Sequence, residues 1–231
     1  MGRFRFLHLM VFLTLLAGSG PLYGQHLIRF YMKAKVGYRD DKGAIVVPAT
    51  YDAGSEFIEG RALVVRDNLR GFLDVFGTEV IPLQFTDAGV FNKGIARVAR
   101  DGKYGWIRPD GSYSIPAQFD LADEFCDGLA RVMIGGKFGY INRDGQTIIA
   151  LQYQNARNFS SGLAPVYDGK KWGFIDAAGK WILPASFDDA QSFHNGESLV
   201  RKGEKMYFID TKGKRTRELE VPEEEFTKRK R

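Results

Sequence analysis

The sequence predicts an all-β protein built from tandem repeats, and three observations lead to this fold class. Glycines recur every 34 residues in three separate columns, segments of alternating apolar and variable residues recur at the same interval, and turn-forming residues separate them. A fixed period of this length is typical of repeat architectures, and period-2 alternation is typical of half-buried strands. The columns are Gly37, Gly71, Gly105, Gly139 and Gly173; Gly60, Gly94, Gly128, Gly162 and Gly196; and Gly43, Gly77, Gly111, Gly145, Gly179 and Gly213.

Residues 1–24 are predicted to be a secretory signal peptide. A basic start precedes an apolar run from Phe6 to Ala17, and small residues follow that run. This order is typical of a cleaved leader, and the run is too short to cross a bilayer as a helix. Cleavage is expected after Ser19 or Gly24. The mature chain is therefore expected to be exported, to the periplasm, the cell surface or the medium, with no stable membrane insertion; an uncleaved anchor is the alternative.

The repeat domain is predicted over residues 25–215, followed by a charged tail, 216–231. Framed from the first strand of each unit, six units cover almost the whole mature chain, and the last of them is degenerate. Degenerate ends suit an array in which each terminal unit lacks one neighbour. An open array is therefore favoured over a closed, propeller-like ring. The units are 26–59, 60–93, 94–127, 128–161, 162–195 and 196–229.

Each unit is expected to form a three-stranded antiparallel meander, opening with a half-buried strand. Ala130 and Val132, for example, alternate with Arg131 and Met133. One face of this strand is small and then β-branched in nearly every unit, and that face is expected to be core. The other face varies from unit to unit as Leu63, Arg97, Arg131, Pro165 and Leu199.

The second strand carries an aromatic residue on each side of a glycine, as in the segment 104–108. Glycine inside a strand indicates close approach of another group, and the flanking aromatic side chains are the expected reason. An Asp/Asn-x-x-Gly turn of type I then leads to a short third strand. Because proline tolerates only strand ends and edges, this strand is expected to end at proline. These prolines are Pro48, Pro82, Pro116 and Pro184.

A connector closes each unit with an aromatic residue, a small residue and then phenylalanine. Three recurring apolar positions indicate a packed segment. The phenylalanine column is therefore expected to fill the gap between neighbouring units and to belong to the core. Its members are Phe57, Phe91, Phe125, Phe159 and Phe193.

These strings resemble the WG repeat, also written KWG. The segment Lys171-Trp172-Gly173-Phe174-Ile175-Asp176 carries the motif literally, and the resemblance covers about residues 26–215. Departures are Arg70 for the aromatic residue, Ala150 for proline and Tyr207 for glycine. The resemblance implies an all-β repeat with a binding or surface role by analogy. It supplies no catalytic residues.

Charge is distributed unevenly between the repeats and the tail. Residues 25–211 hold 23 basic and 23 acidic side chains, whereas the segment after Thr211 holds 8 basic and 5 acidic ones. A neutral body argues against a nucleic-acid-binding face. The terminal cluster Lys228–Arg231 could touch nucleic acid or anionic lipid, but a solvated end is favoured. A monomer that binds a protein or glycan partner is expected.

No residue pattern points to catalysis, a metal or a cofactor. His26 and His194, the histidines beyond the leader, lie in different units without partners at ligand spacing, and Cys126 is the single cysteine. Asp52, Asp120 and Asp188 recur after the connector aromatic. They are expected to cap their own turns; paired acids of a glycoside hydrolase are the alternative.

The aromatic residues flanking the strand glycines are the candidate ligand-binding residues, because exposed rings stack on sugars or anchor partners. Ordinary core is the other interpretation of this column. The sequence therefore predicts an exported, non-enzymatic repeat protein that binds a protein or glycan. A carbohydrate-active enzyme and a purely structural spacer are the alternatives. The candidates are Tyr104, Trp106, Phe138, Tyr140, Trp172 and Phe174.

Overall fold

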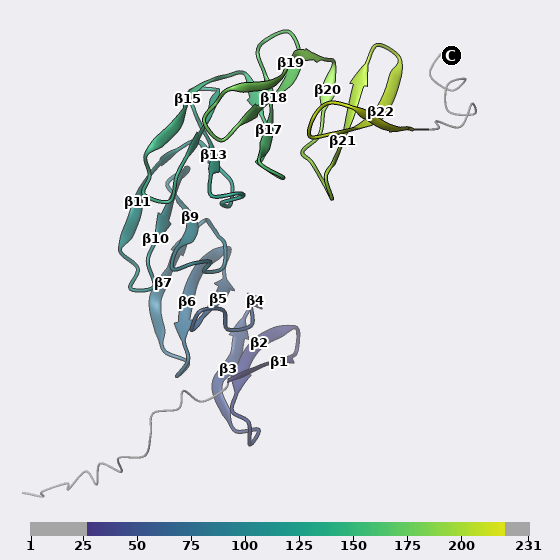
Figure 1. The fold of residues 1–231 in the computed structure, drawn as a ribbon. Helices are drawn as coiled ribbons and strands as arrows, with labels where there is room; N and C mark the ends of the chain where they lie inside the picture. The colour runs from purple at the N-terminus through teal and green to yellow at the C-terminus, as the bar shows by residue number, and fades with distance from the viewer. Residues whose placement is uncertain (1–26, 220–231) are drawn as a thin grey trace, which may run out of the picture.

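The computed structural model describes residues 27–219, which form six small antiparallel sheets arranged one after another in an open arc (Figure 1). The first and last sheets lie at opposite ends of the arc. The all-β fold and the open array are therefore confirmed. Within the described range, no helix is long and apolar enough to cross a membrane. The predicted leader, 1–24, lies outside the described residues.

Every sheet is a meander in which strands follow one another in sequence order. The first contains β1 (Ile28–Met32), β2 (Lys35–Arg39) and β3 (Ile45–Tyr51). The second contains β4 (Ala53–Gly54), β5 (Arg61–Arg66), β6 (Leu69–Asp74) and β7 (Glu79–Phe85). The third contains β8 (Asp87–Ala88), β9 (Ala96–Arg100), β10 (Lys103–Ile107) and β11 (Tyr113–Phe119).

The remaining sheets repeat this arrangement. The fourth contains β12 (Leu121–Ala122), β13 (Ala130–Ile134), β14 (Lys137–Ile141) and β15 (Thr147–Tyr153). The fifth contains β16 (Asn155–Ala156), β17 (Leu163–Tyr167), β18 (Trp172–Asp176) and β19 (Trp181–Phe187). The sixth contains β20 (Asp189–Ala190), β21 (Glu197–Lys202), β22 (Lys205–Asp210) and β23 (Arg215–Glu218).

The short strands β4, β8, β12, β16 and β20 correct the prediction of a three-stranded unit. Each comes from the connector that ends one unit, and each pairs with the first strand of the next unit, as Ala122 does with Val132. The connector therefore does more than fill space between the units with its side chains. It joins two units by backbone hydrogen bonds as well as by its side chains.

The core lies between consecutive sheets. In one cluster, Trp106 and Ile115 of the third sheet pack with Ala130, Val132 and Ile141 of the fourth. The small and β-branched side chains of β5, β9, β13, β17 and β21 are fully buried, as predicted. The long third strands β7, β11 and β15 follow the outer side of the arc, and the first strands follow its inner side (Figure 1). Each sheet therefore covers one face of the sheet before it.

The phenylalanine column packs against the second aromatic residue of the strand motif in its own unit. Ring centroids in the five pairs are 4.8–5.3 Å apart. Phe91, Phe159 and Phe193 are buried, whereas Phe57 and Phe125 are only partly buried. The core assignment therefore holds fully for three of the five rings.

The third strand does not end at proline, and this prediction is wrong. β15, for example, continues to Tyr153 through a bulge that places four residues opposite two of β14. The bulge brings strand backbone onto the motif glycine, so that a Cβ added to Gly139 would lie 2.5 Å from the Ile149 carbonyl oxygen. The glycine is thus required by this neighbouring backbone, not by the flanking aromatic rings.

In the last unit both the motif glycine and the bulge opposite it are missing. Tyr207 stands where the other units have glycine, and β23 pairs with it without the bulge, placing Glu218 opposite Tyr207 and Arg217 opposite Phe208. The side chain and the bulge therefore exclude each other. Because β23 extends to Glu218, the folded domain passes the predicted boundary at residue 215; the tail from residue 220 lies outside the described residues.

The Asp/Asn-x-x-Gly turns form as predicted. At the turn between β6 and β7, the Asp74 carboxylate accepts hydrogen bonds from the backbone N–H groups of Phe76 (3.0 Å) and Thr78 (2.8 Å). Gly77 takes the left-handed conformation, with φ at 82°. Its Cα faces Val47 of the preceding sheet. The turn therefore fixes both the hairpin and its contact with the neighbouring unit.

Asp52, Asp120 and Asp188 were predicted to cap turns in their own connectors, but each caps the hairpin turn of the following unit. The Asp188 carboxylate accepts a hydrogen bond from the Gly203 backbone N–H (2.6 Å), in the hairpin of the next unit, and another from the Lys171 ammonium of its own unit. Asp52 and Asp120 make the equivalent pairs. These carboxylates therefore fasten one unit to the next.

Protonation of these carboxylates at low pH is expected to weaken their hydrogen bonds and so to destabilise the contacts between units. Hydrogen bonds from Lys171 and from the Gly203 N–H lower the pKa of Asp188. A carboxyl whose pKa is lower in the folded than in the unfolded state contributes stability above its unfolded pKa, about 3.9, and this stability is lost as pH falls through the folded pKa. Asp188→Asn is therefore expected to flatten the fall in Tm below about pH 4. Melting curves from pH 7 to pH 2 test this, and parallel curves for the two proteins would contradict it.

Candidate functional site

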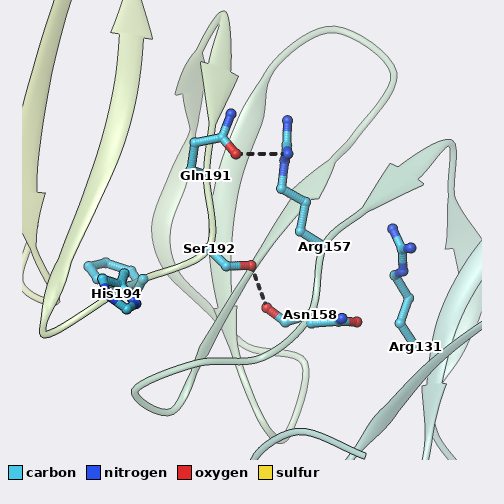
Figure 2. A pocket seen from close by; sticks show the side chains of 7 residues that line it. Arg131, Arg157, Asn158, Gln191, Ser192 and His194 are labelled. Carbon is cyan, nitrogen blue, oxygen red and sulfur yellow. Dashed lines mark hydrogen bonds between the residues drawn. The ribbon is translucent and has the colours of Figure 1, made fainter. Parts of the chain in front are cut away.

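A pocket on the inner edge of the arc is lined by residues of the fourth sheet and by the connectors that enter the fifth and sixth sheets (Figure 2). It has a volume of about 440 Å³. Its walls come from β13 and from the two connectors that follow the edge strands β16 and β20. These are positions where the units differ, so this surface is specific to its place in the array. The lining residues are Arg131, Arg157, Asn158, Gln191, Ser192, Phe193 and His194.

Arg157 joins the two connectors at the centre of this pocket. Its Nη1 donates a hydrogen bond to Gln191 Oε1 (2.9 Å), and its Nη2 donates one to Asp189 Oδ1 (3.1 Å). The guanidinium carbon lies 5.2 Å from the centre of the Trp172 ring, within the range of a cation–π contact. The Ser192 hydroxyl donates to the Asn158 carbonyl oxygen (2.7 Å), forming a second link between the connectors (Figure 2).

Arg131 forms the opposite wall. Its guanidinium pairs with the Asp123 carboxylate (2.7 and 2.8 Å), donates to the Ala156 carbonyl oxygen and lies 5.1 Å from the Phe138 ring centre. Each arginine is thus held by a carboxylate and an aromatic ring. Such support fixes a guanidinium in one orientation before any ligand arrives.

Two polar atoms at this pocket have no hydrogen-bond partner among the described residues. They are Arg157 Nε and Asn158 Oδ1, and both are buried. A buried donor or acceptor left unpaired costs about 1–3 kcal/mol, so an unpaired atom calls for an explanation. One atom is a donor and the other an acceptor, and they belong to adjacent residues in one pocket wall.

Tyr140 holds the connector that carries Arg157 in place from the core side. Its hydroxyl donates a hydrogen bond to the Arg157 carbonyl oxygen (2.7 Å). Burial raises the pKa of Tyr140 far above its ordinary value, so the hydroxyl stays protonated and remains a donor. The equivalent Tyr38 donates to Ser55 in the first unit. The second aromatic column therefore supports the connectors from within the core.

The six predicted ligand-binding aromatics do not form an exposed surface. Trp106, Tyr140, Trp172 and Phe174 are buried, and they are divided among three separate core clusters. Tyr104 and Phe138 are half-buried, and Arg97 and Arg131 lie over their rings. The burial supports the core interpretation of this column and places no free ring face at the pocket.

The arginines and connector amides were the residues that sequence reasoning missed. Arg131 belongs to the variable face of the first strand, and Arg157 and Gln191 belong to the variable part of the connector. Variation within an otherwise regular repeat was the available signal. No cluster of three or more histidine, cysteine or acidic side chains suited to a metal ion occurs in the part of the chain that the structure describes.

Solved structures resemble this fold at low sequence identity. Kluyveromyces lactis Hsv2 matches with 10% identity over 80% of this chain and 70% of its own, at a TM-score of 0.48. A eukaryotic initiation factor matches with 10% identity over 86% and 64%, at 0.50. An extracellular domain from a one component system of B. thetaiotaomicron matches with 13% identity over 85% and 33%, at 0.42. Identities this low concern the fold alone.

Family membership rests on the sequence repeats. No curated protein matches the chain. The family described as WG containing repeat matches in five tandem units, at residues 37–69, 71–104, 104–138, 138–172 and 172–205. These matches cover well over half of the 231 residues, and each runs from the strand with the motif glycine in one sheet to the corresponding strand of the next. The chain therefore belongs to the WG containing repeat family.

Proposed function

We propose that this chain is an exported, non-enzymatic binding protein, and that the pocket between Arg131 and His194 takes a glycan. The unpaired Arg157 Nε and Asn158 Oδ1 carry the proposal. A sugar hydroxyl both donates and accepts hydrogen bonds, so neighbouring hydroxyls of one sugar suit an unpaired donor beside an unpaired acceptor.

The other lining groups also suit a polyhydroxylated ligand. Gln191, Ser192 and His194 add amide, hydroxyl and imidazole groups from a second connector. The charges of Arg131 and Arg157 are already balanced by Asp123 and Asp189. A neutral or weakly charged ligand is therefore favoured over a polyanion. A polar loop of a protein partner is the alternative occupant.

A binding role is preferred over the hydrolase alternative because of the positions of the recurring carboxylates. Asp52, Asp120 and Asp188 each hold a lysine and a hairpin turn. Two carboxyl groups facing one substrate across 5–10 Å would be needed for glycoside hydrolysis. The leader predicted at residues 1–24 supports export, to a compartment where envelope glycans are available.

Removing Arg157 is expected to weaken glycan binding about tenfold or more, because a hydrogen bond to a charged group contributes about 1.5–3 kcal/mol. Calorimetric titration of the full chain with soluble oligosaccharides from envelope polysaccharides tests this. Arg97→Ala is the matched control: Arg97 also stacks on an aromatic ring and pairs with carboxylates, but it lies outside the pocket.

The two variants separate the possible outcomes. Binding by the wild type and by Arg97→Ala, together with loss in Arg157→Ala, would support the proposal. Equal loss in both variants would assign the effect to general destabilisation. If no oligosaccharide binds the wild type, the glycan assignment is wrong.

A further inference from the structure

A tight turn precedes the first long strand of the second to sixth sheets, and it leaves two backbone N–H groups for other acceptors. Its two central residues take the left-handed conformation, as Asp127 (φ 50°) and Gly128 (φ 85°) do. The flanking residues Cys126 and Leu129 exchange both of their backbone hydrogen bonds (2.9 and 3.0 Å), which is the pattern of a two-residue hairpin. The N–H groups of the two central residues take no part in that exchange.

Two of these turns bind a carboxylate from the unit before them. The Glu59 carboxylate accepts hydrogen bonds from the backbone N–H groups of Lys93 (2.6 Å) and Gly94 (2.8 Å). The Asp127 carboxylate accepts one from the Gly162 N–H (2.9 Å). The same turn thus holds a side-chain carboxylate at two places in one molecule, so its backbone is suited to this group.

The turn at Asp127 and Gly128 lacks such a carboxylate. Lys93 stands at the repeat position from which Glu59 and Asp127 reach the next turn. Among residues 27–219, no acceptor bonds to the backbone N–H of Asp127 or of Gly128, and both residues are exposed. A cation therefore replaces the anion at this position, while the two backbone donors of the turn remain open.

Arg143 brings a second cation to the same junction. It belongs to the turn between β14 and β15, and its Nη1 donates a hydrogen bond to the Asn92 carbonyl oxygen (3.0 Å), directly before Lys93. Its guanidinium carbon lies 4.7 Å from the centre of the Phe125 ring, two residues before Asp127. Arg143 therefore lies between the turn that carries Lys93 and the turn with the open donors.

The ion pairs around this junction leave positive charge unbalanced. In the part of the chain that the structure describes, neither Lys93 nor Arg143 pairs with a carboxylate. The acidic side chains of the adjoining connector are already engaged, since Asp123 pairs with Arg131 and Glu124 with Arg97. Two cations and two backbone donors at one exposed turn suit a single anionic group.

We propose that the turn at Asp127 and Gly128 binds a glutamate or aspartate side chain from a peptide segment of a partner protein, with Lys93 and Arg143 on either side of the carboxylate. A side-chain carboxylate is the group that the equivalent turns already hold. An exposed turn suits a side chain that projects from another chain, whereas a small ligand such as a sugar needs a concave site. The turn lies outside the pocket proposed to take a glycan, so the two proposals stand independently.

Backbone amide NMR of the full chain tests this site with N-acetyl-glutamate α-amide, whose one charged group is a side-chain carboxylate. The signals of Asp127 and Gly128 are expected to shift and to saturate at roughly millimolar probe, as for a ligand of this size. The neutral glutamine counterpart of the probe is expected to leave both signals in place.

Lys93→Glu is the informative variant, because it supplies the carboxylate that Glu59 gives to the preceding turn. It is expected to abolish the response to the probe and to raise Tm by about 2–4 °C, as for one added link in a domain of this size. Lys137→Glu is the matched control. It reverses the charge of another exposed lysine, at the far end of the β13–β14 hairpin, and is expected to leave the response unchanged.

Three results would overturn the proposal. The first is the absence of a shift at Asp127 and Gly128 in the wild type, or an equal shift with the glutamine counterpart. The second is an undiminished response in Lys93→Glu. The third is tighter binding of galacturonate than of the peptide probe, which would assign the turn to acidic glycans.

Discussion

Phe159→Ala is expected to lower the free energy of unfolding by about 3–5 kcal/mol, the usual cost of removing a buried phenylalanine. Phe159 is 2% exposed, and its ring lies 4.8 Å from that of Tyr140. The residue belongs to a connector that joins the fourth and fifth sheets. The substitution therefore opens a cavity where two units meet, and urea unfolding of the two proteins measures the loss.

Phe125→Ala provides the comparison within the same column. Phe125 is only partly buried, and Arg143 lies over its ring. Its removal is expected to cost less than the removal of Phe159. Equal losses at the two positions would show that burial does not set the contribution of this column, and a loss below about 1 kcal/mol for Phe159 would contradict its role between units.

Gly139→Val is the second large effect, with an expected destabilisation of about 3 kcal/mol, the upper end of the range for overpacking. An added Cβ would lie 2.5 Å from the Ile149 carbonyl oxygen and 2.8 Å from the Leu151 nitrogen. Both are backbone atoms and cannot turn aside as a side chain can. The bulge of β15 must therefore shift or open, which differential scanning calorimetry detects as a lower Tm.

Gly128→Ala is the matched control for this substitution. Gly128 has a φ of 85°, and no heavy atom outside its immediate chain neighbours lies within 4 Å of an added Cβ. Its replacement costs only the strain of the left-handed conformation, about 1 kcal/mol. If Gly128→Ala proves as damaging as Gly139→Val, close approach of the third strand is not the reason for the motif glycine.

The period predicted most of the fold. Alternation identified the buried face of the first strand, with Ala130 and Val132 fully buried, and the Asp-x-x-Gly pattern identified the turns. The bulge could not be predicted, because proline restricts one backbone position but does not show whether pairing resumes beyond it. The two-residue strands were not predicted for a related reason. Each one pairs with the first strand of the following unit, so its own sequence does not identify it as a strand.

The site was harder to predict than the fold. Alternation shows which residues share a face, but not which face meets the neighbouring sheet, so Trp106 and Phe174 were candidates for a surface that they do not reach. The pocket depends on Arg157 and Gln191, which are 34 residues apart and meet only when the units stack. Variation at otherwise regular positions was the one signal in the sequence for these residues, and it does not show which of the variable positions meet.

Hydrogen–deuterium exchange with and without bound oligosaccharide tests the central claim most directly, because it locates the ligand on the array without any substitution. The account predicts slower exchange in the two connectors around 155–158 and 189–194, with the outer strands unchanged. Protection along β7, β11 and β15, or spread evenly over all units, would contradict a binding pocket on the inner edge of the last three sheets.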